Sequence, residues 1–209
     1  IEKFHSADDE KLQRYFTQIR KSGSRLMSLL NDLLDISKME AGRMEYKFEQ
    51  NDLWKIIKDV CEELTSLFQD KGLLLNVQEP EVDTTVYCDA FKIGQVVQNL
   101  LNNAIRYTPE ESEISIHCKT GIVERSQRKI SGLIVTVKDQ GVGIPDDELD
   151  LIFDKFTQSS KTKTGAGGTG LGLAICHEII EAHSGIIWAE NLPEEGAAFS
   201  FVLPETLDS

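Results

Sequence analysis

The sequence has 209 residues, of which 22 are basic and 35 acidic, so its formal net charge is −13 at pH 7. This length supports one ordinary hydrophobic core and an appendage. The acidic balance excludes broad, sequence-independent attraction to nucleic acid or to anionic lipid. No window approaches the ~20 apolar residues of a membrane span, and no basic-then-apolar signal segment opens the chain.

The cysteines are far apart and form no C-x-x-C pair; they are Cys61, Cys88, Cys118 and Cys176. This spacing predicts neither a zinc cluster nor a disulfide framework, and it favours a reducing cytosol. Because the chain begins with Ile1 in polar helical sequence, we expect it to be a fragment of a longer protein.

The first predicted element is a long amphipathic helix from about Asp9 to Met44, without proline. Apolar residues recur there at alternating steps of four and three, as on the seam of a helical bundle. A pattern of ~35 residues is far longer than the mean helix of about 11–12 residues, which favours a bundle over an ordinary globular helix. The seam comprises Leu12, Phe16, Ile19, Leu26, Leu30 and Leu33, with Tyr15, Leu29, Leu34 and Ile36 beside it.

A compact α/β domain is predicted to follow, from residue 45 to residue 209. Its expected helices are Leu53–Gln69, Ala90–Arg106 and Leu171–His183. Its expected strands are Met44–Phe48, Leu73–Val77, Glu113–Lys119, Leu133–Asp139, Gly185–Glu190 and Ala198–Leu203.

The first chemical motif is a polar ridge on the predicted helix that begins at Ala90. Its residues are spaced by four, four and three, so their side chains lie on one face; they are Gln95, Asn99, Asn103 and Arg106. Amide oxygens are hard ligands for Mg²⁺, and a guanidinium pairs with phosphoryl oxygens. Asn is a poor helix former, so its repetition here favours a site over a solvated helix face. The apolar residues expected to face the core are Val96, Val97, Leu100, Leu101 and Ala104.

The second motif follows a β-branched run that ends in a carboxylate and two glycines. The residues are Asp139, Gly141 and Gly143, followed by Ile144 and Pro145. Glycines allow positive φ and close backbone approach, and a carboxylate beside an apolar pocket accepts from an exocyclic amine such as that of adenine. Taken alone, the D-x-G-x-G pattern is equally typical of a loop turn.

The third motif is the glycine-rich segment from Lys161 to Leu173, which leads directly into the last predicted helix. Glycines before a helix N-terminus present free backbone amides to a phosphate, and Lys161 and Lys163 add positive charge. The segment therefore predicts a phosphate-binding site.

Three other interpretations of this region fit less well. A Rossmann G-x-G-x-x-G motif would follow a buried strand, whereas residues 157–164 are wholly polar. A Walker A loop would place Gly-Lys-Ser/Thr after the glycines. His177 and His183 are six positions apart rather than the four of H-E-x-x-H, so we expect a surface helix end there and no metal site.

The three motifs occur in the order and spacing of the N, G1 and G2 boxes of sensor histidine kinases, and the chain resembles that family from about Leu12 to Pro204. Residues 153–156 resemble the F box, and residues 29–42 are similar to the second helix of the dimerisation and phosphotransfer domain. The resemblance implies a two-layer α/β domain of the Bergerat type at 45–209, with a mixed sheet and helices on one face. It also implies that residues 1–44 contribute one helix to a dimeric four-helix bundle.

The resemblance implies a role for each site residue. Asn103 would hold Mg²⁺, Asn99 and Arg106 would lie near phosphate, Tyr107 would lie against the base, and Asp139 would bind the adenine amino group. Gly141 and Gly143 would shape the pocket, and Gly168, Gly170, Leu171 and Gly172 would offer backbone amides to phosphate. The ATP lid would run from Thr157 to Gly168, and the further expected ATP-binding residues are Ile144, Phe156, Lys161, Lys163 and Thr169.

The implied reaction is transfer of the γ-phosphate of ATP to a histidine, for relay to an aspartate of a response regulator receiver domain. The implied partners are ATP or ADP, a second copy in a homodimer and that receiver domain, with no nucleic acid. Two rival functions are a hydrolytic ATPase of the same fold and a module that only binds nucleotide. The ATPases carry Glu four residues before the metal-binding Asn, where this chain has Asn99. A module that only binds nucleotide would be expected to have lost one of the nucleotide-binding boxes, whereas this sequence keeps all of them.

The sequence departs from the family pattern in two places. Residues 194–199 lack one glycine and one hydroxyl of the usual pattern, and we expect a structural effect only. The H box is absent, because His5 is followed by Ser-Ala-Asp-Asp rather than by an acidic residue and an Arg-Thr-Pro type sequence. We therefore expect this fragment to bind ATP without phosphorylating itself.

Overall fold

The computed structural model describes residues 2–125, 127–161 and 169–205, and it describes no side chains for residues 2–10, Lys21 and Arg25. The chain divides into two compact units, Ile1–Met44 and Glu45–Ser209. None of the described helices is both long and apolar enough to cross a membrane.

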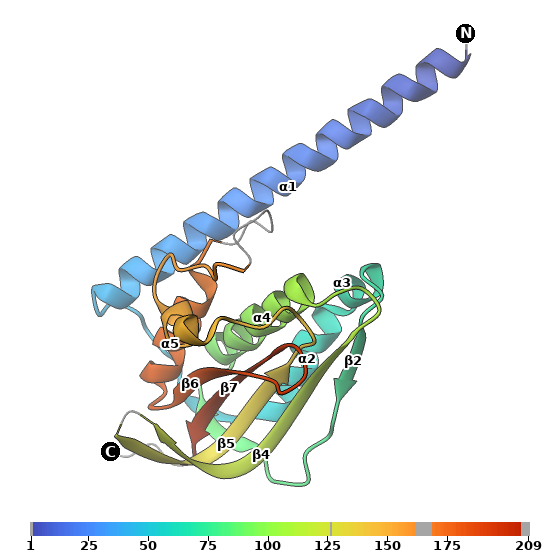
Figure 1. Cartoon of the computed structure of the whole chain (residues 1–209). Helices are drawn as coiled ribbons and strands as arrows, with labels where there is room; N and C mark the ends of the chain where they lie inside the picture. Colours follow the sequence, from blue (N-terminus) through green and yellow to red (C-terminus); the bar gives the residue numbers. More distant parts are fainter. Residues whose placement is uncertain (1, 126, 162–168, 206–209) are drawn as a thin grey trace. The chain divides into compact units, whose positions relative to one another are not determined.

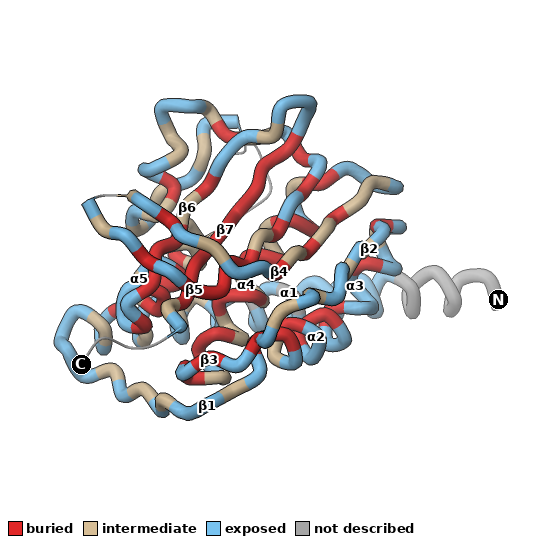
Figure 2. Tube along the Cα trace, turned by 90° about the horizontal axis from the view of Figure 1, so that it is seen from below, coloured by how far each residue is buried: buried red, intermediate tan, exposed pale blue. Residues whose placement is uncertain are grey.

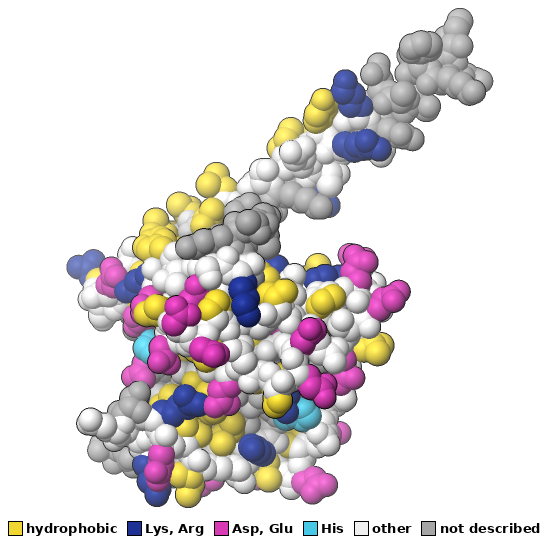
Figure 3. All heavy atoms as spheres, viewed as in Figure 1, with side chains coloured by type: hydrophobic (Ala, Val, Ile, Leu, Met, Phe, Trp, Pro, Cys, Tyr) yellow, Lys and Arg dark blue, Asp and Glu magenta, His cyan; other side chains and the backbone are white. Residues whose placement is uncertain are grey.

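The first unit is a single helix, α1 (Glu2–Glu40). It ends four residues before the predicted end because Gly42, at φ +62°, turns the chain into the left-handed region. There the N–H of Gly42 donates to Met39 O and that of Arg43 to Lys38 O, which is the hydrogen-bond pattern of a Schellman cap. Figure 3 shows hydrophobic side chains gathered along one side of the described part of α1. Most of the predicted seam is exposed in this chain, including Ile19 and Leu26 at 67% each.

The second unit contains a five-stranded mixed sheet, in the order β2-β4-β5-β7-β6 (Figure 1). The strands are β2 (Leu74–Val77), β4 (Glu113–Arg125), β5 (Arg128–Lys138), β6 (Ile186–Asn191) and β7 (Ala197–Pro204). β2 pairs with β4 in parallel, and the remaining pairs are antiparallel. The predicted mixed sheet is confirmed.

The helices α2 (Leu53–Glu63), α4 (Ala90–Tyr107) and α5 (Gly172–Ala182) cover one face of this sheet (Figure 1). Buried residues are concentrated where helices and strands meet (Figure 2). As predicted, α4 buries its apolar face, with Val96, Val97, Leu100 and Leu101 at 0% exposure and Ala104 at 1%. This two-layer arrangement positions one end of α4 and one end of α5 beside the loops that carry the sequence motifs.

Two local predictions are wrong, and one strand pair was missed. The predicted helix Leu53–Gln69 is two helices, α2 and α3 (Thr65–Asp70), because the backbone at Leu64 leaves the helical region at ψ 0°. The predicted strand Met44–Phe48 has no regular structure. Instead β1 (Glu49–Asp52) pairs antiparallel with β3 (Thr85–Cys88), which was not predicted. Pairing with a distant strand overrides the low β-propensity of Glu-Gln-Asn-Asp.

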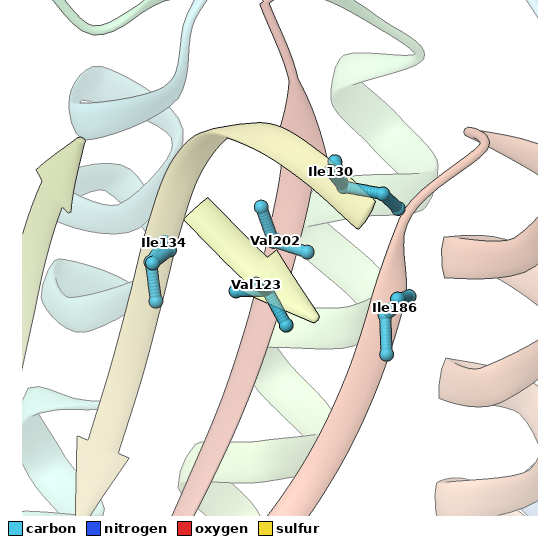
Figure 4. Close-up of a cluster of buried hydrophobic side chains, with 5 residues drawn as sticks. All are labelled: Val123, Ile130, Ile134, Ile186 and Val202. Carbon is cyan, nitrogen blue, oxygen red and sulfur yellow. The ribbon is translucent and has the colours of Figure 1, made fainter. Parts of the chain in front are cut away.

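The β4–β5 hairpin extends beyond the predicted strands and folds over the sheet face that is turned away from the helices. Its extension buries Val123 and Ile130 against Ile134, Ile186 and Val202 (Figure 4). Two glycines, Gly121 and Gly132, lie opposite each other where the extension begins. A Cβ at Gly132 would lie 1.9 Å from Leu203 O, so no larger residue fits between β5 and β7 there.

Candidate functional site

The polar ridge of α4 lies outside its buried face, as the predicted periodicity requires. Asn99 Nδ2 donates to Gly172 O at 3.3 Å, which joins the ridge to the start of α5. Asn103 is partly buried and Arg106 is exposed, and neither side chain hydrogen bonds to another described residue. Both remain available to a ligand next to Asn99.

The C-terminal end of α4 is held by a residue that the sequence did not single out. Lys71 Nζ donates to Arg106 O at 3.0 Å and also to Ile105 O. A cation at a helix C-terminus satisfies carbonyls that have no partner within the helix and interacts favourably with the helix dipole. Lys71 therefore fixes the turn that presents Arg106 and Tyr107.

Asp139, at the end of β5, is a buried carboxylate with 5% exposure. Its Oδ1 accepts from the backbone N–H groups of Gly141 at 2.8 Å and Ala197 at 3.3 Å. Burial raises the pKa of Asp139, and these two hydrogen bonds oppose the rise. No described residue donates to Oδ2, so the orientation of the carboxylate is fixed while one oxygen stays available to accept from a ligand amine.

The loop after Asp139 brings the first two motifs together. A Cβ at Gly141 would lie 2.9 Å from Tyr107 O and 2.8 Å from Asp139 Oδ1, so only glycine lets the loop approach α4 this closely. Gly143 has φ +65°, and the next residue, Ile144, is buried at 7% exposure. The predicted need for glycines in this loop is thus explained by a contact and a backbone angle.

Two further residues support this loop, and no local sequence signal identified them. Asn191, at the end of β6, bonds both backbone groups of Ile144, accepting from its N–H at 2.8 Å and donating to its carbonyl at 2.7 Å. Gly196 has φ +102°, and a Cβ there would lie 1.9 Å from Asp139 O. Residues 194–199 lack one glycine of the usual pattern, but they keep Gly196, which packs against the backbone of Asp139.

The third motif turns sharply into α5. Gly170 has φ +72° and its carbonyl accepts from Phe156 N at 2.9 Å. Thr169 Oγ1 accepts from Leu171 N at 3.1 Å, and no side chain of a described residue caps the N–H groups of the first turn that follows Leu171. The backbone N–H groups of the first turn of α5 therefore present a site for an anion.

The lid segment is described only in part. Lys161 Nζ donates to Val142 O at 3.2 Å, which places this lysine beside the loop after Asp139. Phe156 is 66% exposed and has φ +64°. Lys163 and Gly168 lie outside the described residues.

Three contacts therefore bring the three motifs around one site. Asn99 bonds the start of α5, the carbonyl of Tyr107 contacts Gly141, and Lys161 bonds the loop between Gly141 and Gly143. The site combines a carboxylate oxygen that has no described donor, at one end of α4, with the backbone N–H groups of the first turn of α5, near the middle of α4.

The expected surface helix end at the two C-terminal histidines is wrong for His183, which is buried at 1% exposure because segments distant in sequence cover it. His177 is exposed. Within the described ranges, no group of three or more His, Cys, Asp or Glu side chains could hold a metal ion. The side chain of His5 lies outside the described residues.

The fold and the site define a Bergerat-type ATP-binding domain, with a mixed sheet covered by helices on one face. The sequence profile of the family described as "Histidine kinase-, DNA gyrase B-, and HSP90-like ATPase" matches residues 88–207, more than half of the chain. The chain belongs to this family, and its catalytic domain is of the histidine-kinase type, homologous to sensor histidine kinases.

The chain is 31% identical over 205 residues to the adaptive-response sensory kinase SasA of Microcystis aeruginosa, covering 96% of this chain and 51% of that protein. It is similar to full-length ShkA in complex with AMPPNP, with a TM-score of 0.72 and 25% identity over 94% of this chain and 39% of the other. It is also similar to the histidine kinase ThkA in complex with the response regulator protein TrrA, with a TM-score of 0.71 and 28% identity over 93% of this chain and 52% of the other. The chain spans about half the length of SasA, and only 11% and 24% of two other curated relatives.

Proposed function

We propose that this chain binds ATP together with Mg²⁺ and presents the γ-phosphate to a histidine on a dimerisation domain. The observation that carries the proposal is the pairing of a fixed carboxylate and an uncapped helix N-terminus in one site. Asp139 Oδ2 would accept from the adenine amino group, and the first turn of α5 would bind phosphate oxygens. The similarity to ShkA, crystallised with AMPPNP, supports a nucleotide of this type.

The remaining site residues divide between the two ends of the nucleotide. Tyr107, Gly141, Gly143 and Ile144 would surround the base, and Phe156 would border the lid. Asn99, Arg106, Lys161, Lys163, Gly168, Thr169, Gly170, Leu171 and Gly172 would lie along the phosphates.

Asn103 is the residue that would hold Mg²⁺. Its partly buried amide has no partner among the described residues, and it lies one helical turn from Asn99. Mg²⁺ usually takes one or two protein oxygens and completes its octahedron with substrate phosphates and waters, so a single amide fits. The bound ion would supply neutralisation of phosphate charge.

In the transfer step, the bond between the γ-phosphorus and its bridging oxygen breaks, a bond to the imidazole nitrogen of the acceptor forms, and ADP leaves. A neutral imidazole is itself a nucleophile, so the chain needs to position the phosphate and stabilise its charge rather than remove a proton. Asn99 suits this role because its amide is fixed on Gly172 O and cannot serve as the base of a hydrolytic ATPase.

The first unit is proposed to be the second helix of a dimerisation and phosphotransfer domain, with residues 45–209 as the catalytic domain. The exposed apolar seam of α1 supports self-association into a homodimer. A response regulator receiver domain is proposed as the final acceptor, which the ThkA complex with TrrA supports. We place the chain in the cytosol, where its free, buried cysteines would stay reduced.

The reaction is tested by adding a separate histidine-bearing dimerisation domain and ATP labelled at the γ-phosphate. We expect label on that domain that is labile in acid and stable in base. Rapid release of inorganic phosphate without any labelled protein would instead favour the hydrolytic function. An Asn103→Ala variant serves as the control, and it should label the acceptor far more slowly.

A further inference from the structure

A buried polar node joins three segments of the second unit at a distance from the nucleotide site. The segments are residues 45–48, the N-terminus of α4 at Asp89 and the C-terminus of α5 at His183. None of these residues takes part in the proposed binding of ATP. The proposed binding of ATP therefore does not account for the node.

His183 is the centre of the node. Its Nε2 accepts from Asp89 N at 3.0 Å, and its Nδ1 lies 2.7 Å from Ile179 O. Because a carbonyl only accepts, Nδ1 carries the proton and the ring is neutral. Burial lowers the pKa of His183, which keeps the ring in this neutral form.

Asp89 connects the ring to the other two segments. Its Oδ1 accepts from Lys92 N at 3.0 Å and so caps α4, while its Oδ2 accepts from Lys47 N at 2.8 Å. Asp89 is only 7% exposed, and its backbone N–H is the group that bonds His183. One residue thus links α4, α5 and residues 45–48 by hydrogen bonds.

Aromatic contacts add to the same connection. The rings of Tyr46 and Phe48 lie 5.7 Å and 4.8 Å from that of His183, and the Tyr46 ring meets it edge-on. Phe48 also stacks on Tyr87 of β3 at 6.0 Å. Residues 45–48 are therefore held on both sides, although they form no regular structure.

The node lies at one end of each of the two helices, α4 and α5, that contribute to the nucleotide site. α5 carries the node at its C-terminal end and the phosphate-binding turn at its N-terminal end, about 16 Å away along the helix axis. α4 carries the node at its N-cap and Asn99 in its middle. Residues 45–48 directly follow the first unit in the chain, so a force on that segment acts on the two helices that hold the nucleotide.

We propose that His183 is a positioning residue that couples residues 45–48 to the relative placement of α4 and α5, and thereby to ATP affinity and phosphate transfer. This inference rests on the proposed function. ATP bound between α4 and α5 favours one spacing of the helices, and the node favours the same spacing. By reciprocity, ATP must then stabilise the node by the same factor by which the node strengthens ATP binding.

Two variants separate the hydrogen bond from the packing. His183→Gln keeps an acceptor for Asp89 N–H, whereas His183→Phe keeps an aromatic ring and leaves that N–H without its acceptor. His117→Phe is the matched control, because His117 lies on β4 and, among the described residues, hydrogen bonds to Gln78 and Ser115. We expect His183→Phe to weaken ATP binding roughly 5-fold or more and to slow phosphate transfer. We expect His183→Gln to recover most of both losses, and His117→Phe to match the wild type.

Amide hydrogen exchange of the wild-type chain tests the coupling without any variant. Adding AMPPNP and Mg²⁺ should slow exchange at Lys47 and Asp89, and His183→Phe should abolish this response. Unchanged exchange at both amides in nucleotide-saturated wild type would overturn the inference, even if the variants were unstable. Equal ATP affinity in His183→Phe and His117→Phe would overturn it as well. If wild type itself bound no ATP, the proposed function would fail first, so the two failures are distinguishable.

Discussion

At the scale of single residues, the site keeps a carboxylate where burial disfavours its charge. The backbone donors to Asp139 Oδ1 only partly offset the burial that raises its pKa above the ordinary 3.8. A group whose pKa is raised on folding contributes most to stability below its unfolded pKa, and this contribution is lost as the pH rises through the folded pKa. The ionised carboxylate is therefore expected to serve ligand binding at the expense of stability.

Asp139→Asn tests this trade-off. The amide oxygen still accepts from the N–H groups of Gly141 and Ala197, but an amide NH₂ replaces the acceptor for the adenine amine. We expect ATP affinity to fall by at least about 10-fold, since two donors then face each other. The midpoint of thermal unfolding should stay equal or rise, and its gain over wild type should grow as the pH rises above the ordinary carboxyl pKa of 3.8. A variant that lost stability but bound ATP normally would contradict the assigned role.

Gly196→Ala tests the backbone beneath the carboxylate. The new Cβ would collide with Asp139 O in a left-handed backbone conformation, so we expect the free energy of unfolding to fall by about 2–4 kcal/mol. Gly94→Ala in α4 is the matched control, because its Cβ would meet Ile56 and Val60 side chains at 3.8 and 3.9 Å. That change should raise stability by roughly 0.5–1 kcal/mol. Urea unfolding measures both, and equal effects would argue against the strain at Gly196.

At the scale of elements, periodic patterns were predictable and long-range pairings were not. The apolar face and polar ridge of α4 follow from the 3.6-residue period, and the structure buries the predicted face. β1 was missed because its partner β3 is more than thirty residues away in the sequence and its own residues have little β-propensity. The burial of His183 was missed for a related reason, since the segments that cover it are distant in sequence.

The same contrast applies to the site. Asp139 and its glycines were predictable because the D-x-G-x-G pattern, which alone is equally typical of a loop turn, stands between the two other motifs in a characteristic order and spacing. Asn191 and Gly196 act from β6 and from the turn before β7, and only the folded sheet brings them to that loop. Their contribution depends on tertiary contacts that no local spacing reports.

The hairpin extension of β4 and β5 offers a test of its packing over the sheet. Ile130→Ala removes a side chain with 8% exposure from the cluster in Figure 4, so we expect a loss of about 2–3 kcal/mol. Ile122→Ala, at a position with 61% exposure on the same hairpin, should cost about 0.5 kcal/mol or less. Both variants should bind ATP like wild type, because the cluster lies on the sheet face away from α4 and α5. A comparable loss in both, measured by urea unfolding, would show that the extension does not pack as described.

At the scale of the whole molecule, the exposed seam of α1 predicts self-association. Leu26→Glu places a charge on the seam and should shift the chain toward monomer in sedimentation velocity. Ser28→Glu adds the same charge at an exposed position off the seam and should leave the dimer intact. A wild-type chain that stayed monomeric at every concentration tested would contradict the proposed dimer.

The central claim is that the three motifs form one site for ATP and Mg²⁺, and calorimetric titration of the wild-type chain tests it most directly. We expect saturable binding of ATP at one site per chain when Mg²⁺ is present, and binding weaker by at least about 10-fold in Asn103→Ala. Circular dichroism of the same samples would establish that both proteins are folded. Absence of binding of either ATP or ADP by folded wild-type chain in the presence of Mg²⁺ would contradict the account.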